Sequence, residues 1–445
     1  MISEGNEFKE SQNRMTKYKW RKLKIGDTCF LVKNSYSPTK NENKSYIGLE
    51  HIGQGTLKLV GIGNSEEIKS VKLMFKSGNI LFGKLRPYFR KVYMPNFDGV
   101  CSTDFFVIQE KKEFDNKYLF YFFSSWDIVN EATKSSEGTR MPRASWEYLS
   151  NLKRIFPPLP DQKVIAKVLS DLDDKIELNN EMNKTLEEIG QILFRRWFTD
   201  FEFPDENGNP YQSSGGEMIY SRELGKDIPK EWKVEKVRNI IDHYIGGGWG
   251  SEKEENTNSI GSFVIRGTDF SHIKFGNVKN IPFRYHKKST YNVRCLKPFD
   301  FILEISGGSY GQPVGRTLLI TPQLLGQLGN NAICASFCKL MRLKSKISPF
   351  YFDLYLNELY SNKKIMLYQQ QSTGISNFNF EFFLDDVNIF ITDEKSSCKM
   401  DNILSTLYLI ISKNRLENQF LSELRDTLLP KLMSGEIRVP LEANQ

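Results

Sequence analysis

The stretch that decides the fold is residues 161–203, DQKVIAKVLSDLDDKIELNNEMNKTLEEIGQILFRRWFTDFEF. It follows the proline-rich run 157–160 and continues for about 40 residues without another proline or a turn dipeptide, which predicts one long helix with Asp161 as its N-cap. Spacings of three and four place Ile165, Leu169, Leu172, Ile176, Asn179, Asn183, Leu186, Gly190, Leu193 and Trp197 on one coiled-coil-like seam. Asn179 and Asn183 interrupt the apolar seam, and buried amides at such positions lower stability while fixing register and partner.

The helical pattern occurs twice in the chain. A shift of 235 residues, from 169 to 404, superposes Leu169, Ser170, Leu172, Ile176, Asn179, Asn183, Leu186 and Glu188 on identical residues, which indicates an internal duplication. We therefore expect a second long helix near the C-terminus, packed against the first. The residues expected to pack in this helix pair are Ile165, Leu169, Leu172, Ile176, Asn179, Asn183, Leu186, Leu193, Leu404, Leu407, Ile411, Asn414, Asn418, Leu421 and Leu428.

Length and composition are those of a folded chain with more than one domain. The chain has 445 residues, of which 39% are hydrophobic and 26% charged. The first 17 residues are polar and the apolar runs are too short to cross a bilayer, so we expect a cytoplasmic protein without a signal peptide. Of six scattered cysteines only Cys334 and Cys338 are close, with no further ligands nearby, so we expect free thiols and no metal site.

The regions outside the two helices share one scheme. Short strands and turns follow Trp20, and the same order of patterns restarts at Trp232, which predicts two mixed α/β domains without a regular βαβ repeat. Residues between the first helix and Trp232 are rich in Gly, Asn, Ser and Pro and read as an exposed linker. The expected organisation is a domain at 1–156, a helix at 157–203, a linker at 204–230, a second domain at 231–392, and a helix with a C-terminal tail at 393–445.

The sequence lacks the motifs of several enzyme classes. Asn209-Pro210-Tyr211 lacks the second proline of the loop that holds a target amine in DNA methyltransferases, and no Gly-rich stretch matches a cofactor or phosphate fingerprint. Walker-type spacing and a Ser-His-Asp pattern are also absent from the sequence. We therefore expect a chain that has no catalytic residues and binds no cofactor itself.

The candidate functional residues are instead cations and amides in loops. The net charge is +7, while residues 161–200 hold six basic and nine acidic residues, so the rest of the chain carries +10 and favours a polyanionic partner. Arg can bridge guanine N7 and O6, Asn or Gln can bridge adenine N7 and N6, and Lys holds phosphates. The residues that we predict to contact DNA are Lys84, Arg86, Arg90, Arg140, Arg143, Arg266, Tyr310, Arg316, Gln371, Ser376 and Asn377.

Several longer motifs resemble the specificity subunit of type I restriction-modification systems. They are Pro158-Leu159-Pro160-Asp161-Gln162, Leu172-Asp173-Asp174-Lys175-Ile176, Trp197-Phe198-Thr199-Asp200-Phe201, Ser213-Ser214-Gly215-Gly216-Glu217, and Leu424-Arg425-Asp426-Thr427-Leu428-Leu429-Pro430-Lys431-Leu432-Met433-Ser434-Gly435-Glu436-Ile437. The resemblance in layout covers nearly the whole chain, while the domains match only through marks such as Trp20 and Trp232. The second helix departs from the first at Tyr408-Leu409-Ile410, which replaces the Asp-Asp-Lys run.

The resemblance implies an α+β fold in which two mixed α/β target-recognition domains are joined by two long helices, packed as an antiparallel coiled coil with a pseudo-two-fold repeat. It implies a non-catalytic subunit that binds a bipartite, gapped target in double-stranded DNA. The implied partners are two modification (methyltransferase) subunits with S-adenosylmethionine and restriction (endonuclease and translocase) subunits with ATP and Mg, and no membrane. The alternative interpretations are a self-contained DNA methyltransferase with a fused recognition domain, and a coiled-coil scaffold that binds acidic proteins.

Overall fold

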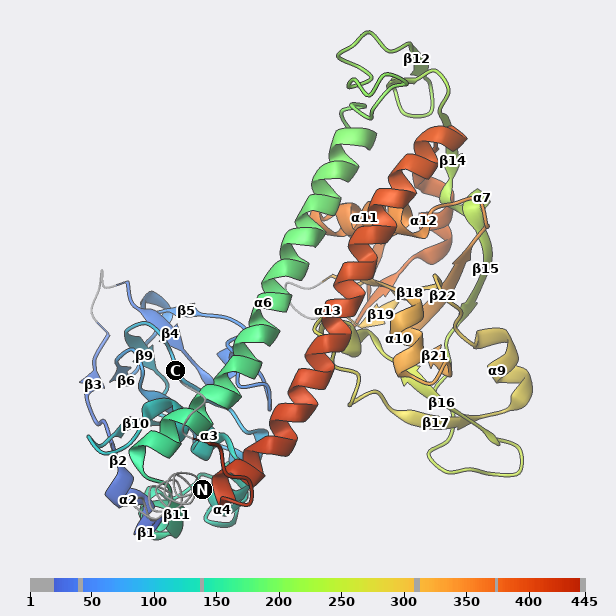
Figure 1. Ribbon diagram of the computed structural model, residues 1–445. Helices are drawn as coiled ribbons and strands as arrows, with labels where there is room; N and C mark the ends of the chain where they lie inside the picture. The colour runs from blue at the N-terminus through green and yellow to red at the C-terminus, as the bar shows by residue number, and fades with distance from the viewer. Residues whose placement is uncertain (1–19, 39–42, 137–139, 308–312, 373–374, 441–445) are drawn as a thin grey trace, which may run out of the picture. The chain divides into compact units, whose positions relative to one another are not determined.

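The computed structural model describes residues 20–38, 43–136, 140–307, 313–372 and 375–440 (Figure 1). The chain divides into two compact units: unit 1 comprises residues 1–174 and 421–445, and unit 2 comprises residues 175–420. Each unit holds one mixed α/β domain together with part of helix α6 (Leu159–Phe198) and part of helix α13 (Glu394–Ser434). The expected domain limits at 1–156 and 231–392 stay a prediction.

In unit 1 the strand β1 (Arg21–Lys24) pairs with β11 (Lys153–Phe156) and joins the two ends of the domain. One sheet has the order β2-β10-β7-β8 and a second has the order β3-β6-β9-β4-β5, in which β4 and β9 run parallel. The other elements are α2 (Ile25–Thr28), β2 (Cys29–Leu31), β3 (Ser35–Tyr36), β4 (Ser45–Ile47), η1 (Leu49–His51), β5 (Gly63–Asn64), η2 (Ser65–Glu67), β6 (Lys72–Phe75), β7 (Ile80–Gly83), η3 (Pro87–Phe89), β8 (Val92–Tyr93), β9 (Gly99–Cys101), β10 (Phe105–Glu110), α3 (Asn116–Ser124), α4 (Trp126–Lys134) and α5 (Trp146–Asn151).

In unit 2 the strand β14 (Lys233–Lys236) pairs with β25 (Asn388–Ile391), and the sheets have the orders β15-β22-β18-β20, β17-β16-β21 and β19-β24-β23. A hairpin of β12 (Met218–Ser221) and β13 (Lys226–Pro229) occupies the predicted linker. The other elements are α7 (Val237–Ile240), β15 (Ile241–Gly246), β16 (Ile260–Ile265), η4 (Gly267–Asp269), α8 (Phe270–Lys274), β17 (Phe283–His286), α9 (Lys288–Arg294), β18 (Phe301–Glu304), β19 (Ser306–Gly307), β20 (Thr317–Leu319), α10 (Pro322–Gln327), β21 (Ala332–Cys334), β22 (Cys338–Leu343), α11 (Pro349–Ser361), η5 (Lys364–Tyr368), β23 (Gln369–Ser372), β24 (Ile375–Phe378) and α12 (Phe380–Asp386).

The two domains repeat one topology, element by element. The order β2-β10-β7-β8 in unit 1 corresponds to β15-β22-β18-β20 in unit 2, and the strand pair β1 and β11 corresponds to β14 and β25. In both units a short strand and its 3-10 turn, β4 with η1 and β16 with η4, precede a parallel partner, β9 or β21. The duplication that the helices show as identities therefore extends into the domains as topology.

Each domain shares a hydrophobic core with the long-helix segments of its own unit. Helix α3 has the sequence NKYLFYFFS and buries every residue from Tyr118 to Ser124, because it lies between a sheet and the long helices. Its apolar side chains belong to one cluster with Ile165 and Leu169 of α6 and Leu429 of α13. In unit 2 helix α11 joins Phe194 and Trp197 of α6 and Leu404 of α13 in a corresponding cluster. Burial on all sides explains why α3 lacks an amphipathic pattern.

The predicted 40-residue helix is present as α6, but it begins at Leu159 and not after Asp161. The N-cap prediction for Asp161 was wrong because Pro160 fits the first helical turn, where a missing N–H leaves no hydrogen bond unmade. The Asp161 carboxylate instead accepts a hydrogen bond from the indole Nε1 of Trp20 at 3.3 Å. The repeated helix is present as α13, which includes Pro430.

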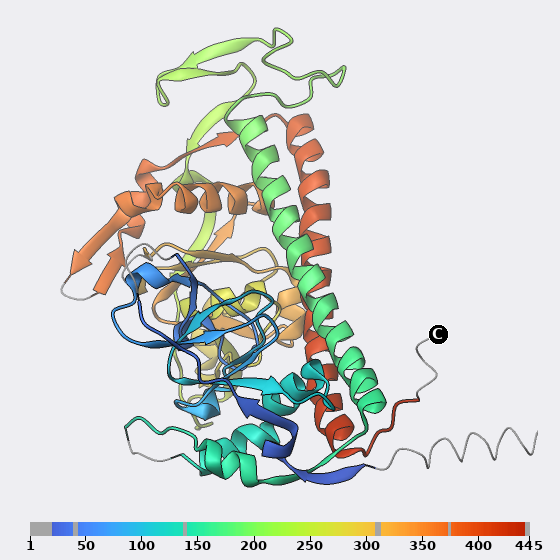
Figure 2. The same ribbon diagram turned by 90° about the vertical axis from the view of Figure 1, so that its left-hand side faces the viewer.

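Helices α6 and α13 pack side by side in antiparallel orientation (Figure 2). None of the residues that we predicted to pack in the pair is exposed: Ile165, Leu169, Ile176, Asn179, Asn183, Leu404, Ile411 and Asn418 are buried, while Leu172, Leu186, Leu193, Leu407, Asn414, Leu421 and Leu428 are half-buried. Ion pairs between Lys175 and Glu417 (3.5 Å) and between Arg415 and Glu187 (2.9 Å) flank the seam.

The asparagines of the seam bind one another. Asn179 Nδ2 donates to Asn418 Oδ1 at 3.0 Å and to Glu417 Oε2 at 2.7 Å, and Asn414 Nδ2 donates to Asn183 Oδ1 at 2.9 Å. Because the shift of 235 residues relates 179 to 414 and 183 to 418, the second asparagine pair is the image of the first. Asn179 Oδ1 and Asn183 Nδ2 have no hydrogen-bond partner among the described residues, so one amide–amide bond links each asparagine pair. Such a bond between buried amides still selects one register, since a slip of either helix would break it.

The domains are fastened to the long helices by different hydrogen bonds in the two units. In unit 1 Asp173 of α6 accepts from Tyr121 of α3 at 2.7 Å and pairs with buried Arg425 of α13 at 2.6 Å. In unit 2 the position that corresponds to Asp173 is Tyr408, which donates to Asp353 of α11 at 2.5 Å. The carboxylate acceptor lies on the long helix in unit 1 and on the domain in unit 2, so the donor and the acceptor have exchanged sides.

Replacing Asn418 with leucine is expected to lower the free energy of unfolding by about 1–3 kcal/mol, because the side-chain amides of Asn179 and Asn180 lose their bonds to Asn418 inside the seam. Urea denaturation of the full chain measures this change. The matched control is Asn402→Leu at an exposed position of the same helix, which should stay within about 0.5 kcal/mol of the parent. Equal effects of the two substitutions would contradict a role for the buried amides.

We expect the carboxyl group of Asp353 to change the stability of the protein with pH in the opposite direction to an ion-paired surface aspartate. Burial raises the pKa of Asp353, against the opposing bond from Tyr408, so its stabilising contribution is present at low pH and lost as pH rises through the raised pKa. Asp353→Asn should therefore flatten the stability profile above about pH 4 and leave the protein equally or more stable at neutral pH. Thermal unfolding from pH 4 to 8 tests this, with exposed Asp227→Asn as control.

Candidate nucleic-acid interface

Two cationic segments that are far apart in the sequence meet in unit 1. Arg86 N donates to Pro142 O at 2.8 Å, Ala144 N donates to Lys84 O at 2.9 Å, and Leu85 forms an isolated bridge with Arg143. The segments 84–86 and 140–144 therefore form one exposed edge just beyond strand β7. Residues 137–139, which precede this edge, lie outside the described residues.

Two arginines are exposed at this site. Arg86 and Arg140 are exposed, and an Nη atom of Arg86 donates to the Arg140 carbonyl at 3.4 Å, which holds the two residues together. Arg86 has a φ of 51° and precedes Pro87, which begins the turn η3. A left-handed non-glycine residue is strained, and here the backbone bond to Pro142 compensates for it. The side chain of Tyr88, 43% exposed, lies on the same turn.

Lys84 and Arg143 belong to the same edge but have partners within the unit. The Lys84 ammonium lies 5.6 Å from the ring centre of Phe106, and Arg143 Nε donates to Asp104 Oδ1 at 2.9 Å. Arg143 stays 44% exposed, so one face of its guanidinium is available to a ligand. These contacts orient both cations at the edge of the sheet.

Arg90 requires a correction. It is 4% exposed, its Nε donates to the Ser124 carbonyl at 2.6 Å, and its guanidinium lies 5.2 Å from the ring centre of Trp126. Burial lowers the pKa of Arg90, which is the cost of removing its charge from water. The side chain supports the α3–α4 junction, and we withdraw Arg90 from the residues predicted to contact DNA.

In unit 2 the corresponding edge is the small sheet β19-β24-β23. Ser306 pairs with Asn377 and its Oγ donates to Asn377 Oδ1 at 2.8 Å, while Gln369 Nε2 donates to Ser376 Oγ at 2.8 Å. Asn377 is exposed and Ser376 is half-buried. Gln371 lies in β23 opposite Ser376, and its side chain lies outside the described part of the chain, as does all of Tyr310.

The two edges occupy the same place in the repeated topology. Leu85 lies two residues beyond the end of β7 at Gly83, and Ser306 lies two residues beyond the end of β18 at Glu304. Their partners, Arg143 and Asn377, each lie three residues before the next helix, α5 or α12. The bridge of Leu85 with Arg143 therefore corresponds to the pair of Ser306 with Asn377. One structural position carries arginines in unit 1 and amides with hydroxyls in unit 2.

Arg266 and Arg316 form ion pairs inside unit 2. Arg266 makes two bonds to Asp269, at 3.0 and 2.7 Å, and Arg316 makes two bonds to buried Glu304, at 2.9 and 2.7 Å. The hydrogen bonds to these carboxylates raise the pKa of both arginines. Their planar edges already bind carboxylates, so their predicted contact with DNA is no longer part of our proposal. Glu304 and Arg316 come together through the antiparallel pairing of β18 with β20, which the composition of the segment does not reveal.

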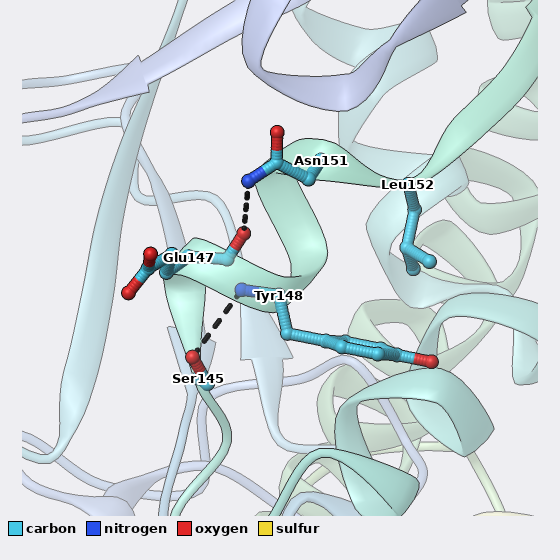
Figure 3. A pocket seen from close by; sticks show the side chains of 5 residues that line it. All are labelled: Ser145, Glu147, Tyr148, Asn151 and Leu152. Carbon is cyan, nitrogen blue, oxygen red and sulfur yellow. Dashed lines mark hydrogen bonds between the residues drawn. The ribbon is translucent and has the colours of Figure 1, made fainter.

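Neither the hollow over α5 nor the buried thiols supply a catalytic nucleophile among the described residues. A shallow hollow of about 440 Å³ lies over α5, where Ser145 caps the helix and Asn151 Nδ2 donates to Glu147 O (Figure 3). Burial raises the pKa of the Cys29, Cys101 and Cys334 thiols to about 12, which removes them as nucleophiles. Within the described ranges no cluster of His, Cys, Asp and Glu could hold a metal, and no helix is long and apolar enough to cross a membrane.

Comparison with known proteins identifies the family. Residues 17–188 match the family described as "Type I restriction modification DNA specificity domain". The specificity subunit of the type I restriction enzyme MjaIX from Methanocaldococcus jannaschii is 27% identical over 332 residues, which cover 73% of this chain and 69% of that protein. The chain belongs to the type I restriction-modification specificity subunits. The resemblance that the motifs indicated is confirmed.

Further comparisons agree with this membership. The HindI specificity subunit from Haemophilus influenzae is 30% identical over 194 residues, 41% of each protein. The crystal structure of a type I restriction-modification S subunit from M. genitalium covers 94% of this chain and 96% of its own, with a TM-score of 0.51 and 15% sequence identity. That likeness confirms the fold class, with mixed α/β domains and two long helices packed together. A specificity subunit is the non-catalytic component of its system, as we predicted from the absent motifs.

Sequence reasoning missed one residue at the unit 2 edge. Ser306 binds Asn377 directly, but it does not stand out from its neighbours in composition or charge. Only the repeat offers a signal, since Ser306 corresponds in position to Leu85 beside the basic segment of unit 1.

Replacing Arg86 or Arg140 with alanine is expected to weaken binding to duplex DNA and, if the arginine neutralises a phosphate, to reduce the slope of log K against log salt by about 0.9. Fluorescence anisotropy at several salt concentrations measures both quantities on the full chain. Lys112→Ala is the matched control. This exposed lysine follows the end of β10 at Glu110, whereas the cationic edge lies near the start of β10, where Phe105 pairs with Gly83. Unchanged affinity and slope in both arginine variants would exclude this edge from DNA contact.

Proposed function

We propose that the two domains of this specificity subunit read the two halves of a bipartite, gapped target in double-stranded DNA. The observation that supports this is the equivalent edge in both units, which carries Arg86 and Arg140 in one unit and Ser376 and Asn377 in the other. Arginine pairs with the acceptors of guanine in the major groove, and asparagine or glutamine pairs with adenine. The two edges occupy equivalent positions but carry different side chains, as expected if the two domains bind half-sites of different sequence. In this proposal the readers are domains 1–156 and 231–392.

The long helices are proposed to set the gap between the half-sites. A helix of 40 residues extends for about 60 Å at 1.5 Å per residue, longer than the roughly 34 Å of one DNA turn. The paired asparagines hold α6 and α13 in one register, so the spacing does not depend on a flexible linker. A fixed spacer of this kind explains how one chain can require a constant number of unread base pairs.

Partner subunits are proposed to dock on apolar side chains that α6 leaves exposed. Leu178, Met182, Ile189 and Ile192 are 53%, 40%, 40% and 61% exposed and recur at helical spacing on one stripe. The corresponding positions on α13 are Lys413, Glu417, Leu424 and Thr427, so the two helices offer unequal outer faces. We propose that two modification subunits with S-adenosylmethionine bind this chain, and that restriction subunits with ATP and Mg complete the complex.

Methylome sequencing of cells that express this chain with its modification partner tests the reading model. The parent chain should produce a gapped bipartite motif that is absent when either protein is missing. Asn377→Ala should relax only one half of the motif and Arg86→Ala only the other, because the two residues belong to different units, and the discrimination lost is about 1–3 kcal/mol for each base. A variant that alters both halves, or neither half, would contradict the assignment of one half-site to each unit.

Insertion of one helical turn into both α6 and α13, at positions related by the shift of 235 residues, is expected to lengthen the unread gap while both half-sites stay the same. The same insertion in α6 alone is the control, since it breaks the asparagine register and should abolish methylation. Sequencing of the methylated motif compares the parent chain, the chain with both insertions and the chain with the insertion in α6 alone. An unchanged gap in the double insertion would rule out a spacer role for the helices.

A further inference from the structure

Unit 1 contains a pocket that the DNA-reading role does not use. It has a volume of about 480 Å³ and is lined by residues at the start of α4, on the strand pair β1 and β11, and in the last turns of α13. Trp126 and Ile155, which line it, are 52% and 50% exposed. Its cationic residues are Lys22, Arg90, Lys153 and Arg154, and its acidic residues are Asp127 and Asp426, so its lining is apolar with an excess of positive charge.

The internal repeat shows what fills the equivalent place in unit 2. Lys22 faces Ile155 across β1 and β11, and the corresponding pair across β14 and β25 is Val234 and Phe390. In unit 2 Phe201 packs against Phe390 of this pair: its ring lies 5.7 Å from that of Phe390 and 5.8 Å from that of Trp232, and it is 4% exposed. Lys226 lies over both Phe201 and Phe390, at 4.8 and 5.6 Å from the ring centres.

The corresponding residue in unit 1 leaves the strand pair uncovered. The shift of 235 residues places Glu436 where unit 2 has Phe201, and Glu436 pairs with Lys431 at 3.4 Å. The next equivalent contact is retained, since Arg438 lies 4.3 Å from the ring centre of Trp20 as Phe203 lies 4.8 Å from that of Trp232. The backbone turn itself differs, because the left-handed residue is Phe201 in unit 2 and Gly435, one position earlier in the repeat, in unit 1. Unit 1 has no aromatic residue at the position of Phe201.

A second pair of replacements opens the floor of the pocket. In unit 2 Arg195 of α6 binds Glu358 of α11 through bonds of 3.0 and 3.1 Å. In unit 1 the shift places Pro430 at the position of Arg195, and Ser125 directly follows α3 at the place of Glu358 when both helices are aligned at their first residues. Two long paired side chains in unit 2 are thus replaced by two short ones in unit 1. Both short residues, Ser125 and Pro430, line the pocket.

We propose that this pocket is a docking site for a segment of a protein partner that carries a phenylalanine flanked by acidic residues. The occupant of the equivalent place in unit 2 has this chemistry, because Phe201 lies between Asp200 and Glu202. The aromatic ring supplies the apolar contact that Ile155 and Trp126 offer, and the flanking carboxylates match exposed Lys22 and Lys153. This inference depends on the repeat and not on the proposed reading of DNA.

A synthetic peptide with the sequence of residues 199–205, Thr-Asp-Phe-Glu-Phe-Pro-Asp, tests the proposal when it carries a fluorescent label and is titrated with the full chain. Binding is expected to weaken by about tenfold or more when Phe201 of the peptide is replaced by alanine, because the buried ring provides most of the contact. Replacing Asp200 and Glu202 of the peptide with Asn and Gln should weaken binding and remove its dependence on salt.

On the protein, Ile155→Glu and Lys22→Glu should each reduce peptide binding, while Lys69→Glu, an equal charge change at an exposed position outside the pocket, should leave it unchanged. Thermal unfolding of each variant confirms that the chain is folded. Failure of the parent chain to bind the peptide, or equal binding of the Phe201→Ala peptide, would overturn the proposal; the latter result would indicate an anion site without an aromatic pocket. Loss of binding in Lys69→Glu would also overturn it.

Discussion

The paired asparagines at the crossing of α6 and α13 are the constraint on which the rest of the structure depends. An apolar seam alone allows two helices to slip by a turn, because leucine meets leucine in several registers. The bonds from Asn179 to Asn418 and from Asn414 to Asn183 are satisfied in one register only. Since the helices are copies of each other, the two pairs enforce the same choice twice. Each domain then attaches to helix segments whose pairing is already fixed.

The attachments show how a duplicated fold can change its chemistry while keeping its shape. In unit 1 a carboxylate of α6 accepts a bond from a tyrosine of the domain, while in unit 2 a tyrosine of α13 donates to a carboxylate of the domain. Either arrangement satisfies a buried polar contact between a domain helix and a long helix. The shared requirement is one donor opposite one acceptor, and the side that carries each is free to change.

The same freedom accounts for the surfaces that we associate with recognition. A backbone pairing between the segment after a sheet strand and the segment before the next helix recurs in both units, and it presents arginines in one and hydroxyl and amide groups in the other. Near the helix ends, Pro430 and Ser125 stand where the other repeat has the ion pair of Arg195 with Glu358. A difference at an equivalent position is informative because the surrounding frame is held constant by the repeat.

The long helices, their internal repeat and the family were determined by the sequence alone. Helical spacing, identical residues at a constant shift and contiguous motifs are local properties, so the existence of α6 was predicted. Its end lies at Phe198 and not at Phe203, and the N-cap role of Asp161 was wrong. Tertiary structure decided which cations are available. Arg90 is buried under Trp126, Arg316 is bound to Glu304, and Arg86 lies beside Arg140. Whether a charge faces solvent depends on segments that pack around it from elsewhere in the chain, and no local pattern in the sequence records that packing.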